Sequence, residues 1–236
     1  MIDLLVSLAI VGVLIALMLP AISMVRESTR KVICASNLRQ VGLGVNMYSQ
    51  DMRDRLPDSV FLPPVAHSEF STAASFDRMD TVWLSLNEFP ERRDDRWDGL
   101  GILYGEEYVS ATKIYYCPSH QGNFNYADAQ DDWQNLSRPE EIIVNYLYRG
   151  TGPNGSRVLF NIEPGAAIVS DTLRSFFDLN HEGGFNVLSA GLAVNWVEDI
   201  GDEIANDLLL RGDDGNNSNT VQDAWGRLDN LPTVND

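Results

Sequence analysis

A segment near the C-terminus concentrates oxygen-bearing side chains that could bind a hard cation. Within residues 211–220 these donors surround Gly215. They are Asp213, Asp214, Asn216, Asn217 and Asn219. Calcium takes roughly six to eight oxygen ligands from flexible loops of this kind, although the spacing here does not match an EF-hand. We therefore expect a weak calcium site, with a solvated acidic loop that binds no metal as the alternative.

The two cysteines, Cys34 and Cys117, are the next candidates for chemistry. Two thiols are too few for a disulfide framework or a four-thiolate zinc site, but they can form one bridge in an exported chain. Such a bridge would join a helix to a strand end and stabilise the fold by roughly 2–4 kcal/mol. Buried free thiols are equally ordinary, so the bridge and the free thiols both stay open.

The three histidines are scattered along the chain. Cys117 and His120 lie close together beside a proline, and we interpret this pair as structural rather than catalytic. For His181 we expect a hydrogen bond to the backbone near the turn formed by Gly183 and Gly184. Metal binding and a role at an interface are the alternatives for this imidazole.

The composition argues against several classes of function. The chain has 34 Asp and Glu residues against 17 Lys and Arg residues, which gives a net charge of -17. Because phosphate binding depends on clustered cations, nucleic acid is not expected as the main partner. The sequence also lacks the nucleophile-elbow, phosphate-loop, zinc-protease and Cys-x-x-Cys motifs. We therefore expect a protein that is not an enzyme.

These side chains must be positioned by a chain whose first part is strongly apolar. No charged residue occurs from Leu4 to Ile22, and a helix of this length extends for about 28 Å, close to the hydrocarbon thickness of a bilayer. A cleavable signal peptide is the main alternative, but the expected basic region and cleavage site are not seen. Asp3 lies at the edge of the segment, where it either pairs with another group or snorkels to water, and Pro20 should kink or locally open the helix.

The helix is expected to continue beyond the apolar segment. From Val25 to Met52, apolar or small residues recur in alternating steps of four and three, which indicates a helical stripe. Pro57 biases the residue before it against helix. We therefore predict one helical element from Met1 to about Asp51, with one half in lipid and the other packed on a head.

The predicted helix combines an apolar run with one acid, one glycine and one proline. The run is MIDLLVSLAIVGVLIALMLPAI, and RESTRKVICASNLRQVGLGVNMYSQD follows it. This combination resembles the N-terminal helix of type IV pilin-like proteins, which a prepilin peptidase cuts and which are then N-methylated. Asp3 matches the family's helix acid, usually Glu, and Gly12 and Pro20 match its helix-weakening positions. Since that acid is normally fifth from the processed end, the resemblance implies two further residues and a leader before Met1.

Two later stretches carry a second set of motifs. Residues 99–119 read GLGILYGEEYVSATKIYYCPS, and residues 180–199 read NHEGGFNVLSAGLAVNWVED. Both resemble a pilin-like subgroup, abundant in planctomycetes, whose C-terminal domain carries a signature of His, nine residues and Asp-Gly. The matching positions are His181, Gly183, Gly184 and Gly191. Gly191-Leu192 stands where Asp-Gly is expected, and we predict a hairpin turn there with Gly191 at positive φ.

The rest of the chain alternates short β-like runs with turns. The runs are rich in β-branched and aromatic residues and are bounded by Gly, Pro and Asn. They are residues 114–117, 142–148, 157–160, 167–170, 185–188 and 193–197. We expect residues 58–97 to form an inserted surface loop region with a short element at 81–86. After residue 200 we expect a short helix at 202–210 and then loops.

These elements predict an α+β fold. Residues 1–53 form the long helix, of which residues 1–22 are the transmembrane segment or filament core. Residues 54–236 form an extracytoplasmic head, in which a mostly antiparallel sheet packs on the C-terminal half of the helix.

The resemblance implies a structural subunit of a type IV pilus-like extracellular filament. Its partners would be further copies of itself in a helical assembly, the prepilin peptidase and the pilus or secretion assembly machinery. It would lie in the bacterial inner membrane before assembly, and afterwards in a surface filament or a periplasmic pseudopilus. Asp3 would pair with the N-terminal amine of a neighbouring subunit in a core of low dielectric constant. The alternatives are a pseudopilin of a type II secretion-like machine and a membrane-anchored extracytoplasmic ligand-binding module.

Overall fold

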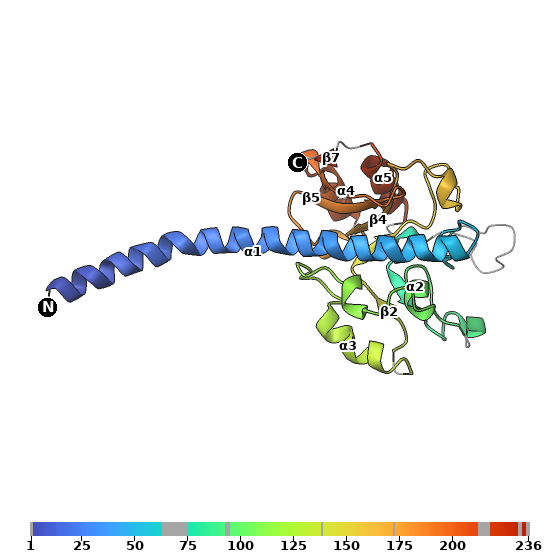
Figure 1. Cartoon of the computed structure of the whole chain (residues 1–236), viewed down its shortest axis with the longest axis horizontal. Coiled ribbons are helices and arrows are strands. Elements are labelled where there is room, and N and C mark those ends of the chain that lie inside the picture. Colours follow the sequence, from blue (N-terminus) through green and yellow to red (C-terminus); the bar gives the residue numbers. More distant parts are fainter. Residues whose placement is uncertain are drawn as a thin grey trace.

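The computed structural model describes residues 2–62, 75–92, 95–137, 139–171, 173–211, 218–230 and 233–234. Figure 1 shows one long helix that projects from a head built of sheets and short helices. The predicted α+β fold class is confirmed. Within the head the helix lies between two groups of elements, with the larger sheet on one side and the smaller sheet on the other (Figure 1).

The long helix is α1, which spans Ile2–Asp51 and passes through Pro20 without a break. Pro20 was expected to kink or open the helix, and Figure 1 shows a gently curved projecting half. The helix ends where Arg53 and Asp54 adopt φ values of 56° and 65°. A left-handed pair of non-glycine residues cannot continue a right-handed helix, so the chain turns back there.

The C-terminal half of α1 forms part of the head's core. Cys34, Leu38, Val41 and Val45 are fully buried, and their spacing confirms the central part of the predicted stripe, whereas Val25, Val32 and Met52 at its two ends are exposed. Gly44 allows a close approach on the same half, because a Cβ there would lie 2.5 Å from Val109 Cγ2. This stretch of helix is therefore shaped to fit the head.

The larger sheet has five antiparallel strands in the order β3-β4-β5-β6-β7. The strands are β3 (Tyr146–Tyr148), β4 (Ala167–Asp171), β5 (Gly184–Ser189), β6 (Val194–Glu198) and β7 (Thr233–Val234). The strands predicted at 167–170, 185–188 and 193–197 are thus confirmed. Strand β5 packs against α1, and its six residues are all buried.

The smaller sheet pairs β1 (Thr81–Trp83) with β2 (Ile142–Ile143). The prediction of one strand over 142–148 was wrong, because the chain passes there from one sheet to the other. Asn145 lies at the crossing, where its backbone N–H donates to Tyr115 O and its side-chain amide to Phe124 O. These contacts replace ladder hydrogen bonds, so the strand is interrupted.

Two other strand predictions were also wrong. Residues 114–117 overlap the 3-10 helix η3 (Thr112–Tyr115). Residues 157–160 form one isolated bridge, between Arg55 and Val158, and then enter the 3-10 helix η4 (Leu159–Asn161). In residues 114–117 the aromatic and β-branched side chains pack in the core rather than pair in a sheet, and local propensity does not separate the two, whereas no residue of η4 is buried and Phe160 is exposed.

Short helices complete the head. They are η1 (Phe76–Arg78), η2 (Pro90–Arg92), α2 (Gly101–Gly105), α3 (Tyr126–Gln134), η5 (Phe176–Asp178), η6 (Ile200–Asp202), α4 (Glu203–Arg211) and α5 (Ser218–Leu228). Helix α4 confirms the helix predicted at 202–210, and Asp199 caps it by accepting from Ile204 N and Ala205 N. Helix α5 was predicted to be loop. Its buried stripe of Val221, Ala224, Trp225 and Leu228 explains the helix.

The segment predicted to be a surface loop, residues 58–97, contributes to the core. Besides β1 it supplies Phe61, Leu62 and Leu84, all of which are buried. Residues 63–74 and 93–94 of this segment lie outside the described residues.

Candidate functional site

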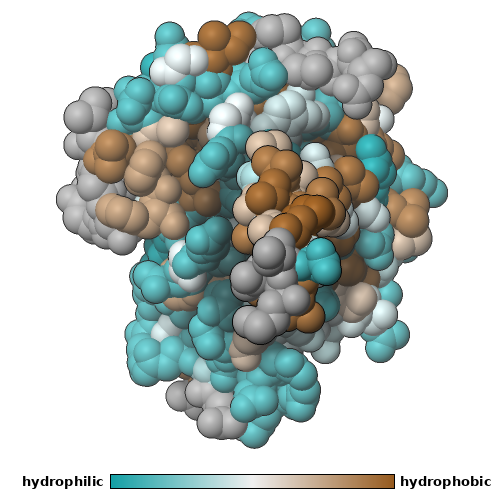
Figure 2. Space-filling model, turned by 90° about the vertical axis from the view of Figure 1, so that its left-hand side faces the viewer, coloured by the Kyte–Doolittle hydropathy of each residue, from teal (hydrophilic) through white to brown (hydrophobic). Residues whose placement is uncertain are grey.

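The first candidate site is the projecting half of α1, which is apolar and uncovered. Its most apolar window has a mean hydropathy of 2.7, and none of that window is buried in the chain's own fold. By length and composition the helix is able to cross a membrane, a test that a signal sequence near the N-terminus also passes. Figure 2 looks toward the free end of the helix and shows its apolar side chains standing in front of a largely hydrophilic head.

The exposed side chains surround the helix rather than forming one stripe. They are Leu4, Val6, Leu8, Ile10, Val11, Val13, Leu14, Ile15, Leu17, Met18, Leu19 and Ile22, each at least 42% exposed. A helix that is hydrophobic on all sides requires an apolar environment on all sides. Such a surface is stable only in lipid or among other apolar helices.

The predicted assembly residues all lie on this projecting half. Asp3 is in the first turn of α1 and forms no ion pair among the described residues. A Cβ at Gly12 would meet nothing within 4 Å, so this glycine is not required by any contact within the chain. Pro20 lies inside the helix, between the free end and the head. The chain's own fold therefore assigns no role to these three residues.

The second candidate site is a buried cluster of Cys34, Cys117 and His181. Cys34 lies on the buried face of α1, Cys117 follows η3, and His181 precedes β5. The two sulfur atoms and a His181 ring nitrogen all lie within 4.8 Å of one another. Cys117 Sγ is 3.4 Å from His181 Nε2. Three residues that are distant in the sequence thus bring three metal-ligand atoms together.

Two carboxylates flank His181, one at each ring nitrogen. Asp171, at the end of β4, places Oδ2 3.5 Å from His181 Nε2 and 3.3 Å from Cys34 Sγ. Glu27 places Oε1 2.6 Å from His181 Nδ1. The imidazole is therefore held in one orientation, with Nδ1 toward Glu27 and Nε2 toward the thiols and Asp171.

Burial controls protonation in this cluster. It raises the pKa of the Cys34 thiol and of the Asp171 carboxyl well above their ordinary values. Burial acts to lower the pKa of His181, but the hydrogen bond with Cys34 and the neighbouring carboxylates outweigh it, and the net shift is upward. Burial therefore disfavours the charged forms of Cys34 and Asp171.

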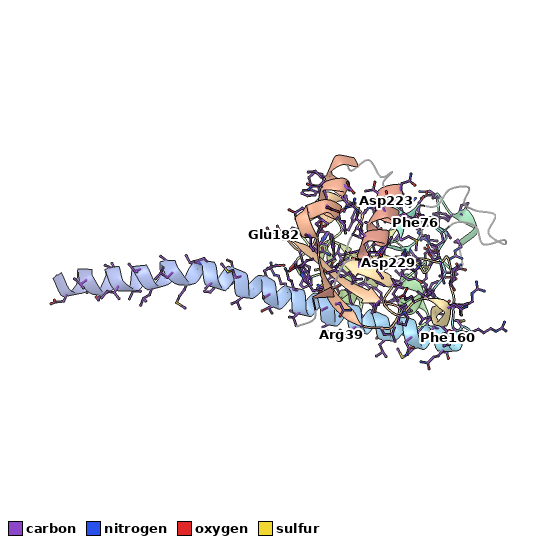
Figure 3. All side chains as sticks on the ribbon, turned by 90° about the horizontal axis from the view of Figure 1, so that it is seen from above. Arg39, Phe76, Phe160, Glu182, Asp223 and Asp229 are labelled. Atoms are coloured by element: carbon purple, nitrogen blue, oxygen red, sulfur yellow. The ribbon has the colours of Figure 1, made fainter. Side chains whose placement is uncertain are left out.

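An open groove lies beside this cluster, and His181 is the one member of the cluster that lines it. It has a volume of about 1240 Å³ and is lined from α1 by Glu27 and Lys31 and from the head by His181 and Glu182. Figure 3 shows Glu182 on the side of the head from which α1 projects. Glu27 thus lies between the buried imidazole and solvent, because its side chain is partly exposed and hydrogen-bonds to His181 Nδ1.

The structure tests several predictions about these side chains. Both cysteines are free thiols in the structure. Because their sulfur atoms lie within 4.8 Å of each other, the disulfide between them stays a prediction. The prediction that His181 hydrogen-bonds to the backbone was wrong, because its ring contacts the side chains of Cys117 and Glu27 instead. His120 does not join Cys117, since its ring hydrogen-bonds to Asn180 Oδ1 and Asn123 O.

Gly183, Gly184 and Gly191, which the resemblance singled out, have separate structural roles. Gly183 adopts a φ of 76°, as the turn before β5 requires. A Cβ at Gly184 would lie 2.3 Å from Val197 O on the adjacent strand. The hairpin predicted at Gly191 is confirmed between β5 and β6, but the positive φ belongs to Leu192, at 66°. Gly191 instead lies close to Pro164, whose carbonyl accepts its N–H at 2.8 Å.

The predicted calcium ligands cannot be placed as a group. Asp213, Asp214, Asn216 and Asn217 lie outside the described residues. Asn219 is exposed near the start of α5. The calcium site stays a prediction.

Sequence reasoning considered the two cysteines together and His181 separately, and it missed Glu27 and Asp171. Glu27 had one signal, as an acid between the apolar segment and the buried stripe of the helix. Asp171 had a weaker one, as an acid at the end of an apolar strand.

Comparison with known proteins yields no match: no protein-family model, no curated protein and no solved structure matches this chain.

Proposed function

We propose that this protein is a structural subunit of a type IV pilus-like filament, held in the inner membrane before it assembles. The observation that carries the proposal is one continuous helix whose first half is apolar on all sides and uncovered, and whose second half is built into the head. A continuous helix of this kind couples the packing of one half to the position of the other.

Insertion of the projecting half into lipid is energetically favourable. Twelve Leu, Ile and Val residues between positions 4 and 22 contribute about -4 to -7 kcal/mol on an insertion scale. Asp3 offsets this by at most about 3 kcal/mol, and by less near the interface. The apolar surface therefore dominates, and the subunit waits in the membrane with its acidic head in water.

Assembly exchanges lipid for neighbouring helices. Apolar helices lose little in this exchange, so van der Waals packing and polar pairing decide whether it proceeds. Asp3 supplies the polar part, because pairing with a cationic group of a neighbouring subunit removes the cost of an isolated charge in the filament core. Gly12 and Pro20 weaken the helix between the free end and the head and allow it to bend during packing.

The groove beside Glu27 and His181 favours a second candidate, a membrane-anchored ligand-binding module. That function uses the apolar helix only as an anchor. It therefore tolerates replacement of Asp3, whereas filament assembly does not.

The test compares Asp3→Ala with Asp223→Ala in the bacterium that produces the protein. Asp223 is an exposed acid on α5 and lies far from the projecting helix (Figure 3). Sheared surface material is examined by negative-stain microscopy and mass spectrometry, and membrane retention by alkaline extraction. We expect Asp3→Ala to reduce the filament fraction at least about tenfold with retention unchanged, and Asp223→Ala to change neither.

Normal filament yield from Asp3→Ala would refute the pairing. Surface material of the unmodified strain that lacks this chain, together with normal membrane retention, would favour the anchored module.

A further inference from the structure

We propose that Cys34, Cys117, His181 and Asp171 form a zinc site that fastens the long helix to the sheet of the head. The inference goes beyond the filament function and does not depend on it. It rests on the donor set, the distances between donor atoms, the hydrogen bonds around them and the route to solvent.

The donor set favours zinc among the common metals. Two thiolates, one imidazole and one carboxylate are all ligands of structural or catalytic zinc sites, whereas calcium and magnesium require oxygen ligands. Soft thiolates also disfavour hard cations. Four protein donors leave no open position, which is the mark of a structural site.

Three of the six distances between donor atoms are close to those of a tetrahedral zinc ion, and the two sulfur atoms and the His181 nitrogen all lie within 4.8 Å of one another. With Zn–S near 2.3 Å and Zn–N or Zn–O near 2.0–2.1 Å, tetrahedral geometry places a sulfur about 3.5 Å from a nitrogen or oxygen donor. Cys117 Sγ lies 3.4 Å from His181 Nε2, and Cys34 Sγ lies 3.3 Å from Asp171 Oδ2. The same geometry separates the nitrogen from the oxygen by about 3.3 Å. His181 Nε2 and Asp171 Oδ2 are 3.5 Å apart.

A second layer of hydrogen bonds orients the ligands. Glu27 accepts from His181 Nδ1, which leaves Nε2 as the ligating nitrogen, and Glu27 is itself held by the hydroxyl of Ser119. Asn186 donates its backbone N–H to Asp171 Oδ1 and its side-chain amide to Oδ2. A carboxylate behind a ligating histidine is the usual partner in zinc sites, and its loss costs about 10- to 100-fold in affinity.

Each sulfur atom also accepts a hydrogen bond, which stabilises a thiolate at that position. Tyr146 donates its hydroxyl to Cys34 Sγ at 3.5 Å, and Ser119 donates its backbone N–H to Cys117 Sγ at 3.4 Å. Zinc takes the place of any protons on the ligating atoms, His181 Nε2 included, and these protons leave to solvent. The charge of the four ligands then exceeds that of the metal by one unit.

The ligands come from four separate segments of the chain. Cys34 belongs to α1, Cys117 follows η3, Asp171 ends β4 and His181 precedes β5. A metal that joins them closes long loops in the unfolded chain and therefore favours the folded state. The groove that reaches His181 past Glu27 supplies the route by which the ion enters.

The experiment uses the full chain in detergent, purified under reducing conditions and stripped with a chelator. Zinc is added and its content measured by mass spectrometry, and cobalt(II) serves as a spectroscopic probe of thiolate ligation and coordination number. We expect one zinc per chain, a tetrahedral cobalt spectrum with sulfur-to-metal bands, and a higher melting temperature with zinc.

Variants then assign the ligands. We expect Cys117→Ser to abolish or halve the sulfur-to-metal band of the cobalt spectrum. Asp171→Asn should lower zinc affinity at least about tenfold, and Glu27→Gln should lower it about 10- to 100-fold. His120→Gln is the matched control, because this histidine lies in the same region but contacts Asn180 and Asn123 instead. It should bind zinc as the unmodified chain does.

Two results for the unmodified chain would overturn the proposal, whatever happens to the folding of the variants. One is substoichiometric zinc with both thiols reduced. The other is isolation of the chain from its native source with Cys34 and Cys117 disulfide-bonded and no metal. A variant Asp171→Asn with unchanged affinity and cobalt spectrum would overturn the assignment of the fourth ligand.

Discussion

The two halves of α1 have the same backbone geometry and opposite surroundings. In the half that lies against the head, one face is fully buried at Leu38 and Val41, and apolar residues on the other side, such as Leu43, stay exposed. In the projecting half the apolar residues occupy all faces, and Leu4 and Leu17 are 73% and 69% exposed. One half carries the surface of a helix that has found its partner within the chain. The other carries the surface of a helix whose partner lies outside it.

The difference also appears in the glycines. Gly44 lies on the buried half, where a side chain would collide with Val109, whereas Gly12 has open space around it. A glycine required by packing and a glycine free of contacts are indistinguishable in the sequence. The comparison therefore separates residues that the fold of the described chain requires from residues that no contact within it requires.

The largest expected effect comes from shortening a buried leucine. Leu38→Ala removes a side chain with no exposed surface, and we expect a loss of about 2–5 kcal/mol in the free energy of unfolding of the head. Leu14→Ala is the matched change in the projecting half, where Leu14 is 55% exposed, and should leave the head's stability unchanged. Urea unfolding of the full chain in detergent, followed by tryptophan fluorescence, measures both. Equal losses would show that the two halves do not differ as described.

A smaller effect is expected when the two glycines are compared. Gly44→Ala forces a Cβ against Val109 Cγ2, and overpacking of this kind costs about 1–3 kcal/mol. Gly12→Ala meets no atom and should raise helix propensity instead. Thermal unfolding by circular dichroism should show a lower melting temperature only for Gly44→Ala. A fall for Gly12→Ala, or none for Gly44→Ala, would contradict the structure.

The smallest expected effect concerns the pH dependence of stability. Asp98 is buried in the head, and burial raises its pKa to about 6, against the hydrogen bonds from Ser59 and Val60. The folded state then binds this proton more tightly than the unfolded state. The contribution to stability is complete below about pH 4 and is lost as the pH rises through about 6.

Asp98→Asn mimics the protonated acid, so the melting temperature of this variant should fall less between pH 4 and pH 7 than that of the unmodified chain. Asp3→Asn, in the exposed half of α1, is the control and should leave the profile unchanged. An unchanged profile for Asp98→Asn would show that other groups govern the pH dependence.

The sequence by itself determined the features that depend on neighbouring residues. The apolar segment, its continuation as a striped helix and the strands around Val169, Val187 and Val197 all follow from local periodicity. The α+β class follows in turn, because a striped helix and half-apolar strands have to cover one another. Helix α5 was not predicted although Val221, Ala224, Trp225 and Leu228 have helical spacing, because so short a helix depends on the burial of that stripe against the head.

Only the tertiary structure decided which chemical groups meet. Nothing local places Cys34, Cys117, Asp171 and His181 around one point, because each lies on a different segment and their distances depend on how α1 crosses the sheet. For the same reason the strand predicted through Asn145 divides between two sheets, as hydrogen bonds to Tyr115 and Phe124 outweigh local strand propensity. Periodicity fixes the face on which a residue lies, and only the packing of distant faces fixes what that residue contacts.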